Sequence, residues 1–591
     1  MDVLISSIQE VLKKLYSQEV LEGQIQIQKT RKDFEGDVTL VVFPLLRVSK
    51  KSPEVTGEEI GKALVEKVEQ VENFNVVKGF LNLSFTANYW VSELSNISKT
   101  ANYGHHQEGE HSRNVMVEYS SPNTNKPLHL GHIRNILLGH SVAEILKANG
   151  HSVKHVQVIN DRGIHICKSM LAWQKFSGGE TPQLTGIKGD KLAGKYYVEF
   201  DKRYKSQIAE LISGGKTEEE AKVEAPLILE AREMLQKWEA NDSEVRVLWA
   251  KMNGWVYDGF DVTYNRLGVD FDKLYYESDT FLIGRVLVKK GVEDGIFYQK
   301  DDNSIWADLT DDGLDQKLLL RADGTAVYMT QDLGTAKLRY DDWPELNQLI
   351  YTVGNEQDYH FKVLFLLLGK LGFEWAENCY HLSYGMVDLP SGKMKSREGT
   401  VVDADDLMDE MLSTARAQSE EKGKLDGLSS EDADALFEML GMGALKYFML
   451  KVDPKKRMLF NPAESIDMQG NTGPFIQYTH ARIQSVLRKA EQSEFSVPSL
   501  DSINENERAL IRLLNQYPEV IKSAGEEYSP AVVANYIYEL AKEYNTFYHE
   551  CPILIEENEK IKQLRLAISK MTANVIGSGM KLLGVQVPDK M

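Results

Sequence analysis

The residues with the clearest capacity for chemistry are two histidines three positions apart, in His129-Leu130-Gly131-His132. At the start of a helix both rings would lie on one face, where unpaired backbone N–H groups and the helix dipole favour anions. A polyphosphate held there would meet imidazole N–H donors, and Gly131 leaves room for a flat ring near the backbone. Two solvated or capping histidines have the same spacing, so the motif alone leaves both interpretations open.

The segment around this motif predicts the elements that would hold it. The β-branched run Val115–Tyr119 predicts a buried strand, SSPNTNKP a loop, and the apolar residues from Leu128 onward a helix with one apolar side. Asn149-Gly150 predicts a left-handed helix end, and Val153–Ile159 a second strand. Strand, loop, helix and strand form a βαβ unit, so we expect parallel strands.

Two later stretches carry groups that could join such a site. Tyr328 and Asp332 are four residues apart and would share one helix face, although a surface ring and carboxylate fit as well. The loop Asp388–Val402 carries Lys393 and Lys395 among glycines, which is typical of a mobile phosphate clamp and also of a solvated basic loop. Its position downstream of the βαβ unit favours the clamp.

Aromatic and basic residues interleave near the C-terminus, where the pattern is helical from about Ser429 onward. Gly470–Tyr478 is followed by Arg482 and Arg488. Single-stranded RNA recognition uses this combination, by stacking and phosphate contact, whereas packing between bundle helices would also use the aromatic residues.

Composition limits the class of protein. A chain of 591 residues should hold several domains, because single cores stop growing near about 250–300 residues. Its three cysteines lie far apart, which argues against a disulfide framework and against zinc, and suits a reducing cytoplasm. The net charge of −20, taken alone, argues against a nucleic-acid partner, although local basic patches can still bind one. No apolar run reaches the ~20 residues of a membrane span.

Taken together these stretches resemble the class I aminoacyl-tRNA synthetases, and within that class the arginyl-tRNA synthetases, over essentially the whole chain. VEYSSPNTNKPLHLGHIRN is similar to that family's HIGH signature and GKMKSREG to its KMSKS loop. DFEGDVTL and GFLNLSF resemble its N-terminal domain, and GNTGPFIQYTHARI and GMKLLGVQVPDKM its anticodon-binding domain. HxGH alone is moderately specific, whereas these blocks in this order are strongly so.

The resemblance implies three domains. We expect a small α/β domain at residues 1–108 that binds the tRNA D-loop. A Rossmann-like α/β catalytic domain with a parallel sheet would follow at residues 109–460, with a helical insertion at about 178–276. An all-α helical bundle at residues 461–591 would bind the anticodon.

The resemblance also assigns the reaction centre. The ATP-binding residues would be His129, Gly131, His132, Lys393 and Lys395. The two histidines would stabilise the transition state of adenylate formation, and Lys393 would hold the leaving pyrophosphate. The chain reads Lys393-Met394-Lys395-Ser396-Arg397 where the general signature reads Lys-Met-Ser-Lys-Ser, so the second lysine is displaced. Either Lys126, just upstream of the HIGH motif, or Lys395 would replace it, and the sequence leaves both open.

For arginine and tRNA the family implies two further sets. The arginine pocket would use Glu118, Asn123, Tyr328, Asp332 and Gln357. Two carboxylates, Glu118 and Asp332, suit a planar and permanently charged guanidinium. The tRNA contacts would be Phe80 and Asn82 at the D-loop, and Phe475, Tyr478, Tyr548 and Met591 near the anticodon.

The implied reaction activates L-arginine with ATP and Mg²⁺ to arginyl-adenylate, then passes the arginyl group to the 3′ end of tRNA(Arg). We expect a cytoplasmic monomer without zinc and without membrane contact, in which tRNA must bind before activation. Two alternatives stay open, a class I synthetase for another amino acid and a non-catalytic RNA-binding paralogue. The intact HxGH and Lys393 disfavour the second.

Overall fold

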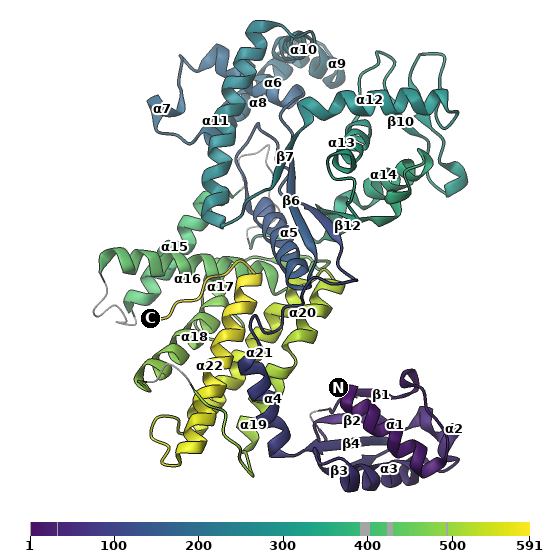
Figure 1. Cartoon of the computed structure of the whole chain (residues 1–591). Coiled ribbons are helices and arrows are strands. Elements are labelled where there is room, and N and C mark those ends of the chain that lie inside the picture. Colours follow the sequence, from purple (N-terminus) through teal and green to yellow (C-terminus); the bar gives the residue numbers. More distant parts are fainter. Residues whose placement is uncertain (1, 32, 391–401, 422–428, 492–494) are drawn as a thin grey trace. The chain divides into compact units, whose positions relative to one another are not determined.

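The computed structural model describes residues 2–31, 33–390, 402–421, 429–491 and 495–591, shown in Figure 1. The chain divides into two compact units. The first holds residues 1–103, 482–517 and 539–575, and the second residues 104–481, 518–538 and 576–591. Four divisions fall inside helices, namely α18 (Gly473–Lys489), α20 (Tyr517–Glu526), α21 (Pro530–Glu550) and α22 (Glu559–Leu582).

The first unit contains the predicted N-terminal α/β fold. Its antiparallel sheet has the strand order β1-β2-β4-β3. The strands are β1 (Gln26–Lys29), β2 (Val38–Val41), β3 (Val71–Val77) and β4 (Phe80–Phe85); the helices are α1 (Asp2–Tyr16), α2 (Leu46–Ser49), α3 (Pro53–Lys67), α4 (Ala87–Lys99) and α19 (Glu505–Asn515). Lys78 and Gly79 both have positive φ, 49° and 79°, as a tight two-residue hairpin requires.

A five-stranded parallel sheet forms the centre of the second unit, in the order β12-β11-β5-β6-β7. Its strands are β5 (Asn114–Glu118), β6 (Ser152–Ile159), β7 (Lys273–Tyr276), β11 (Gln348–Gly354) and β12 (Cys379–Tyr384). The chain runs from β5 to β6 and β7 on one side and returns to β11 and β12 on the other. The order therefore reverses between β5 and β11, and the crevice outside the carboxyl ends at such a reversal is where open α/β sheets bind ligands.

Helices cover both faces of this sheet. They are α5 (Leu130–Ala148) on one face and α12 (Glu277–Glu293), α13 (Tyr328–Asp342) and α14 (Asp358–Lys370) on the other. Met116 and Val156 of the sheet share one core cluster with Leu333 of α13 and Leu364 of α14.

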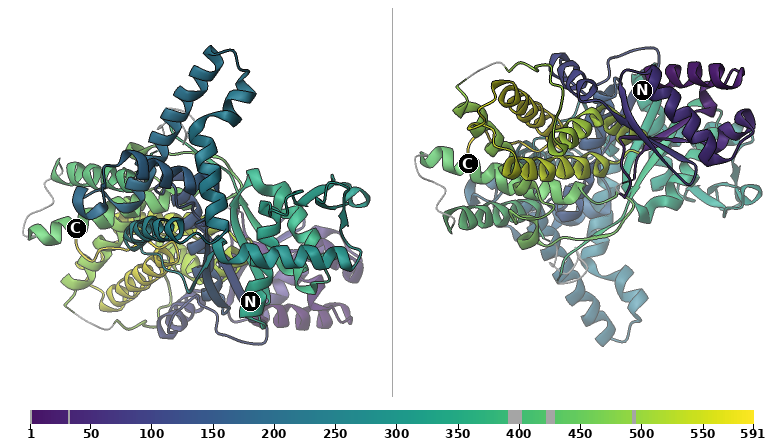
Figure 2. Two further views of the ribbon diagram at one scale, coloured as in Figure 1. Left: turned by 90° about the horizontal axis from the view of Figure 1, so that it is seen from above. Right: turned by 90° about the horizontal axis from the view of Figure 1, so that it is seen from below.

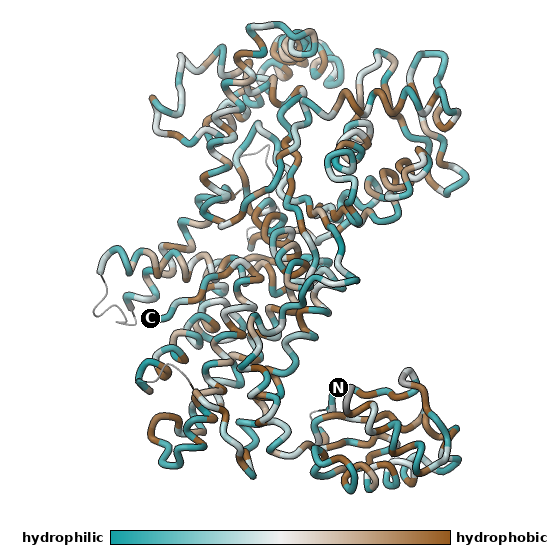
Figure 3. Tube along the Cα trace, viewed as in Figure 1, coloured by the Kyte–Doolittle hydropathy of each residue, from teal (hydrophilic) through white to brown (hydrophobic). Residues whose placement is uncertain are grey.

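The helix α5 is buried on more sides than the sequence predicts. A Cβ at Gly139 would lie 2.3 Å from Cβ of Tyr119, so the helix packs closely on the sheet. Away from the sheet, α5 packs against α16 (Ser430–Leu450), and Oγ of Ser141 donates to the carbonyl of Leu582 at 2.8 Å. A helix enclosed in this way is apolar over most of its surface, as the brown α5 in Figure 3 illustrates.

The helices α12 and α13 meet almost backbone to backbone. A Cβ at Gly334 would lie 2.5 Å from the backbone nitrogen of Gly284, and one at Gly284 would lie 1.8 Å from the carbonyl oxygen of Thr330. Only glycine allows so close an approach. This contact fixes α13, which carries Tyr328 and Asp332, against the helix that follows β7.

The predicted insertion is helical, and it has a core of its own. Its helices are α7 (Pro182–Thr185), α8 (Gly189–Ser213), α9 (Glu218–Glu224), α10 (Pro226–Glu239) and α11 (Ser243–Leu267), which pack with α6 (Ile164–Phe176). A capping box of Thr217 and Glu220 begins α9. Both views in Figure 2 show blue-green helices of this block projecting from the parallel sheet.

The remaining elements are short or helical. An antiparallel sheet of β8 (Tyr298–Gln299), β9 (Ile305–Ala307) and β10 (Lys317–Leu320) escaped the sequence analysis, because such short strands show no clear alternation. The others are β13 (Val387–Asp388), α15 (Ala404–Glu421), β14 (Met458–Leu459), α17 (Pro462–Ser465) and α20 (Tyr517–Glu526). Within the described ranges no helix is both long and apolar enough to cross a membrane.

Candidate functional site

The two histidines of the HxGH motif cap α5 for each other. His129 is the N-cap residue, and its Nδ1 accepts the backbone N–H of Gly131 at 3.1 Å. The Nδ1 of His132 accepts the backbone N–H of His129, also at 3.1 Å. Because each Nδ1 is an acceptor, each neutral ring carries its proton on Nε2. Neither Nε2 has a hydrogen bond among the described residues, so capping leaves two ring N–H donors available to a ligand.

Both imidazoles are neutral at physiological pH. Burial and the charge of Lys126 lower the pKa of His129 to about 3. The same two causes, together with His129 itself, lower the pKa of His132 well below its usual value. The pair therefore presents oriented N–H dipoles at the positive end of a helix rather than two cations.

A cavity of about 660 Å³ lies beside this helix start. Lys126 and His129 form part of one wall, and residues 194–199 of α8 form another. A Cβ at Gly194 would lie 2.7 Å from Cδ of Pro127, so α8 lies directly against the loop. Lys126 has no hydrogen bond or ion pair among the described residues, and burial lowers its pKa. An unpaired cation beside His129 suits a ligand phosphate.

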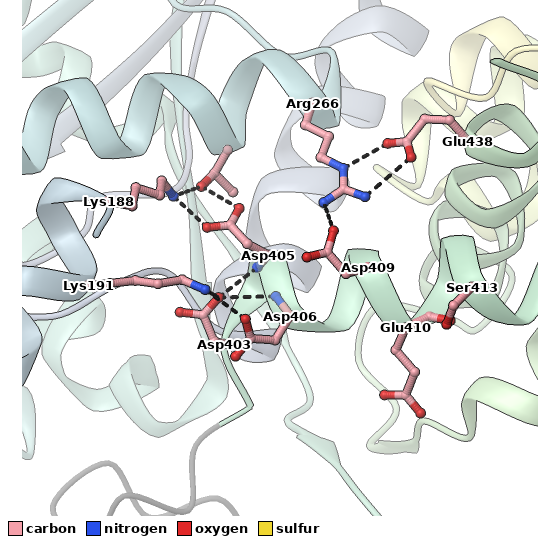
Figure 4. Close-up of polar contacts among 11 residues, drawn as sticks. Lys188, Lys191, Arg266, Asp403, Asp405, Asp406, Asp409, Glu410, Ser413 and Glu438 are labelled. Carbon is pink, nitrogen blue, oxygen red and sulfur yellow. Dashed lines mark hydrogen bonds and ion pairs between the residues drawn. The ribbon is translucent and has the colours of Figure 1, made fainter. Parts of the chain in front are cut away.

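Lys393 and Lys395 lie outside the described residues, which resume at Val402, and several contacts hold residues 402–409 in place (Figure 4). The backbone N–H of Leu130 donates to the carbonyl of Val402 at 3.2 Å. Four ion pairs then hold the start of α15 and the preceding Asp403 to the inserted block. They join Asp403 to Lys191 at 3.2 Å, Asp405 to Lys188 at 2.6 Å, Asp406 to Lys191 at 2.7 Å and Asp409 to Arg266 at 2.6 Å. Residues 402–409 are thus positioned next to His129.

The predicted arginine-binding residues come from the carboxyl ends of the central strands and from α13. Glu118 ends β5 and Asn123 lies in the next loop, where it bridges to Asn160 after β6. Gln357 ends a short 3-10 turn after β11. The helix α13 begins at Tyr328 and carries Asp332 one turn later, which confirms their common face. Asp332 Oδ2 lies 2.6 Å from Nε2 of His360.

Glu118 differs from the other residues of this set because both of its oxygens are engaged. Its Oε2 lies 2.6 Å from Nη2 of Arg339, and its Oε1 accepts the hydroxyl of Ser121 at 2.8 Å. Arg339 is completely buried. The charge of Glu118 is therefore already balanced within the protein.

A third carboxylate, Glu277, was missed by the sequence analysis. It is 6% exposed, and no hydrogen bond or ion pair holds it among the described residues. Burial and the charges of Asp332 and Asp161 raise its pKa to about 7, although the charge of Arg162 opposes this. Glu277 directly follows β7, so an acidic residue at the carboxyl end of a strand was the available signal.

The predicted tRNA contacts are placed less uniformly. Phe80 is half-buried against Phe43, with ring centroids 5.8 Å apart. Asn82 is 2% exposed; its oxygen accepts the hydroxyl of Thr39 at 2.6 Å and its amide donates to Asn75 at 2.8 Å.

The predicted anticodon contacts differ in exposure. Tyr548 is exposed, with the guanidinium of Arg482 at 5.2 Å from its ring. Phe475, Tyr478 and Met591 are half-buried, and Phe475 packs on Tyr538 with ring centroids 5.6 Å apart. Among the described residues no group of three His, Cys, Asp or Glu side chains could hold a metal ion.

Comparison with known families agrees with this arrangement. Residues 93–461 match the class I (R) tRNA synthetase catalytic domain, residues 2–85 the arginyl tRNA synthetase N-terminal domain and residues 476–591 the DALR anticodon-binding domain. The chain is similar to the arginine–tRNA ligase of Bacteroides thetaiotaomicron, with 58% identity over 100% of this chain and 99% of that one. It is also similar to the arginyl-tRNA synthetase structure of Thermus thermophilus, with 25% identity, a TM-score of 0.78 and complete coverage of both chains. The Plasmodium falciparum arginyl-tRNA synthetase structure shares the fold, with a TM-score of 0.74, 19% identity and coverage of 100% and 99%.

Proposed function

The chain belongs to the arginyl-tRNA synthetases, and from this membership we propose how its residues divide the reaction. The enzyme is an arginine–tRNA ligase of class I, with a Rossmann-like catalytic fold, and it uses ATP. The observation that supports our assignment best is the reciprocal cap of His129 and His132, which leaves two Nε2–H donors at the start of α5.

In the first step a carboxylate oxygen of arginine attacks the α-phosphorus of ATP, supplied as its Mg²⁺ complex, and pyrophosphate leaves. No side-chain base is needed, because the carboxylate is already the nucleophile. We propose that the Nε2–H groups of His129 and His132 donate to phosphate oxygens as their charge redistributes. In the second step a 3′-terminal hydroxyl of tRNA attacks the adenylate carbonyl and AMP leaves.

For the displaced second lysine we propose Lys126. Its side chain lines the cavity beside His129 and lacks a partner among the described residues. An ammonium in that position would neutralise charge on the leaving pyrophosphate together with Lys393.

The arginine pocket is proposed with one change from the sequence-based set. Asp332 and Glu277 would face the guanidinium. Glu277 has no hydrogen bond or ion pair among the described residues, and the charge of Asp332 helps to raise its pKa. Tyr328 would flank the side chain, while Asn123 and Gln357 would orient the amino and carboxylate groups. Glu118 would support the pocket from behind, because Arg339 already balances its charge.

The pH dependence of arginine use tests the role of Glu277. We expect kcat/KM for arginine to rise with pH through an apparent pKa of about 7, because the Glu277 carboxylate is charged only above that value. A profile from about pH 5.5 to 8.5 measures this ionisation in the free enzyme. In the Glu277→Gln variant this rise of kcat/KM for arginine with pH should disappear. In the wild type kcat/KM for ATP should not show it. A rise that persists in the variant would contradict the role of Glu277.

We propose an N-terminal domain that binds the tRNA D-loop at residues 1–108, a catalytic domain at residues 109–460 and an anticodon-binding domain at residues 461–591. Phe80 would contact the D-loop, and Phe475, Tyr478, Tyr548 and Met591 the anticodon region. Asn82 is left out of this proposal because its amide is buried and paired inside the first unit. The enzyme would act as a cytoplasmic monomer, in keeping with three free cysteines.

The direct test is ATP–pyrophosphate exchange with each amino acid in turn, with and without total tRNA. We expect exchange with arginine and with no other amino acid, and only when tRNA is present. Exchange with another amino acid would overturn the Asp332–Glu277 pocket, and no exchange from folded protein would overturn the catalytic assignment.

A further inference from the structure

Arg339 is a buried cation with one partner. It lies in the last turns of α13 with no exposed surface, and Nη2 is 2.6 Å from Oε2 of Glu118. The rings of Tyr275 and Tyr351 lie at 5.2 and 5.3 Å from its guanidinium carbon. None of its nitrogens Nε, Nη1 and Nη2 makes a hydrogen bond among the described residues, so its contact with Glu118 is an ion pair. Burying a charge in this way is costly, so the single contact with Glu118 carries most of its compensation.

Glu118 connects Arg339 to a strained turn through a hydrogen bond with Ser121. Its second oxygen accepts the hydroxyl of Ser121 at 2.8 Å, and the same hydroxyl accepts the backbone N–H of Val158 at 3.2 Å. Ser120 and Ser121 both have left-handed backbones, with φ of 71° and 44°. Two successive non-glycine residues in this region are unfavourable and persist only where their surroundings hold them.

The turn joins β5 to the loop that carries the site. Asn123 follows the turn after Pro122 and bridges to Asn160, and the chain then continues through Lys126 to His129. The backbone N–H of Ser120 also donates to Asn135 of α5 at 2.5 Å. A shift of the turn would therefore move Asn123, which orients arginine in the proposed function, relative to α5.

We propose that Arg339 is a positioning residue for arginine activation, acting through Glu118 and Ser121 on the left-handed turn that precedes Asn123. This inference rests on the proposed function of the site. The proposal gives Glu118 a different role from the carboxylates that bind the substrate side chain. Asp332 and Glu277 attract the substrate guanidinium. Glu118, held by Arg339, instead fixes the turn before Asn123, which orients the amino and carboxylate groups of the substrate.

Three variants of the full chain test the proposal through kcat and KM in tRNA-dependent ATP–pyrophosphate exchange. Ser121→Ala removes only the last contact, and we expect kcat to fall about tenfold while KM for arginine changes less than about threefold. Arg339→Met leaves the buried Glu118 without its charged partner, so both kcat and the unfolding temperature should fall. The double variant Arg339→Met with Glu118→Met removes both charges and should regain most of the unfolding temperature. Its kcat should stay at least about tenfold low, because Ser121 still lacks its acceptor.

Arg565→Met is the matched control. Arg565 is also a buried arginine that pairs with carboxylates, Glu507 at 2.7 Å and Glu556 at 2.8 Å, but it belongs to the first unit and none of its hydrogen bonds reaches the turn. This control should lose unfolding temperature while kcat and KM of the folded enzyme stay unchanged.

Two results would overturn the positioning role. If kcat recovers together with the unfolding temperature in the double variant, the ion pair serves stability alone. If Ser121→Ala keeps kcat but raises KM for arginine more than about tenfold, the turn binds substrate and does not position it. The wild-type enzyme is measured first. If it shows no arginine-dependent exchange, the proposed function itself is refuted, and this outcome is distinct from any difference between variants.

Discussion

Asp332→Asn is expected to raise the KM for arginine by about 100-fold and to leave the KM for ATP nearly unchanged. Removing one charge from a partly desolvated, hydrogen-bonded ion pair costs about 2–5 kcal/mol, and about 1.4 kcal/mol corresponds to a factor of ten. Arginine has a permanently charged side chain, so it loses this attraction at every pH. ATP binds at the start of α5 in our proposal and does not use α13.

The experiment is ATP–pyrophosphate exchange with arginine and ATP varied independently, in the presence of tRNA. Asp341→Asn provides a matched control, since Asp341 lies on the same helix and pairs with Lys337 at the surface. That control should change neither constant. Equal increases in both KM values for Asp332→Asn would show that the substitution disturbs the whole site and would contradict a specific contact with arginine.

His132→Ala is expected to lower kcat by about 100-fold or more, with a smaller effect on either KM. The substitution removes an N–H donor that is fixed in place before the reaction, and loss of one such donor costs about 10²–10³ in kcat. It also removes the acceptor for the backbone N–H of His129, which costs about 1 kcal/mol of helix stability.

A second variant separates these two losses. Glutamate is also a natural third residue of a capping box and its carboxylate has no N–H group, so His132→Glu should restore the cap and the unfolding temperature without supplying an N–H donor to the phosphates. Its kcat should therefore remain low in single-turnover measurements of adenylate formation. Turnover close to that of the wild type in both variants would remove His132 from the catalytic group.

Local order in the sequence was sufficient for much of this protein. The apolar run, the loop with two prolines and the helical spacing predicted β5, α5 and β6, because backbone periodicity depends on neighbours within a few residues. The resemblance to the arginyl-tRNA synthetases followed from short blocks in a fixed order. The one-sided burial expected for α5 was wrong, because α16 and the carbonyl of Leu582 cover the side away from the sheet.

The roles of individual charges were decided only by the tertiary structure. Glu118 and Asp332 are equivalent in sequence as two carboxylates near predicted strands or helices, yet Arg339 balances only the first. The place of Glu277 directly after a strand was the only sequence signal for it, and the structure adds that the nearby charge of Asp332 helps to raise its pKa. Whether a charge is free to bind substrate depends on burial and on partners far away in the chain. These are long-range properties that residue spacing does not encode.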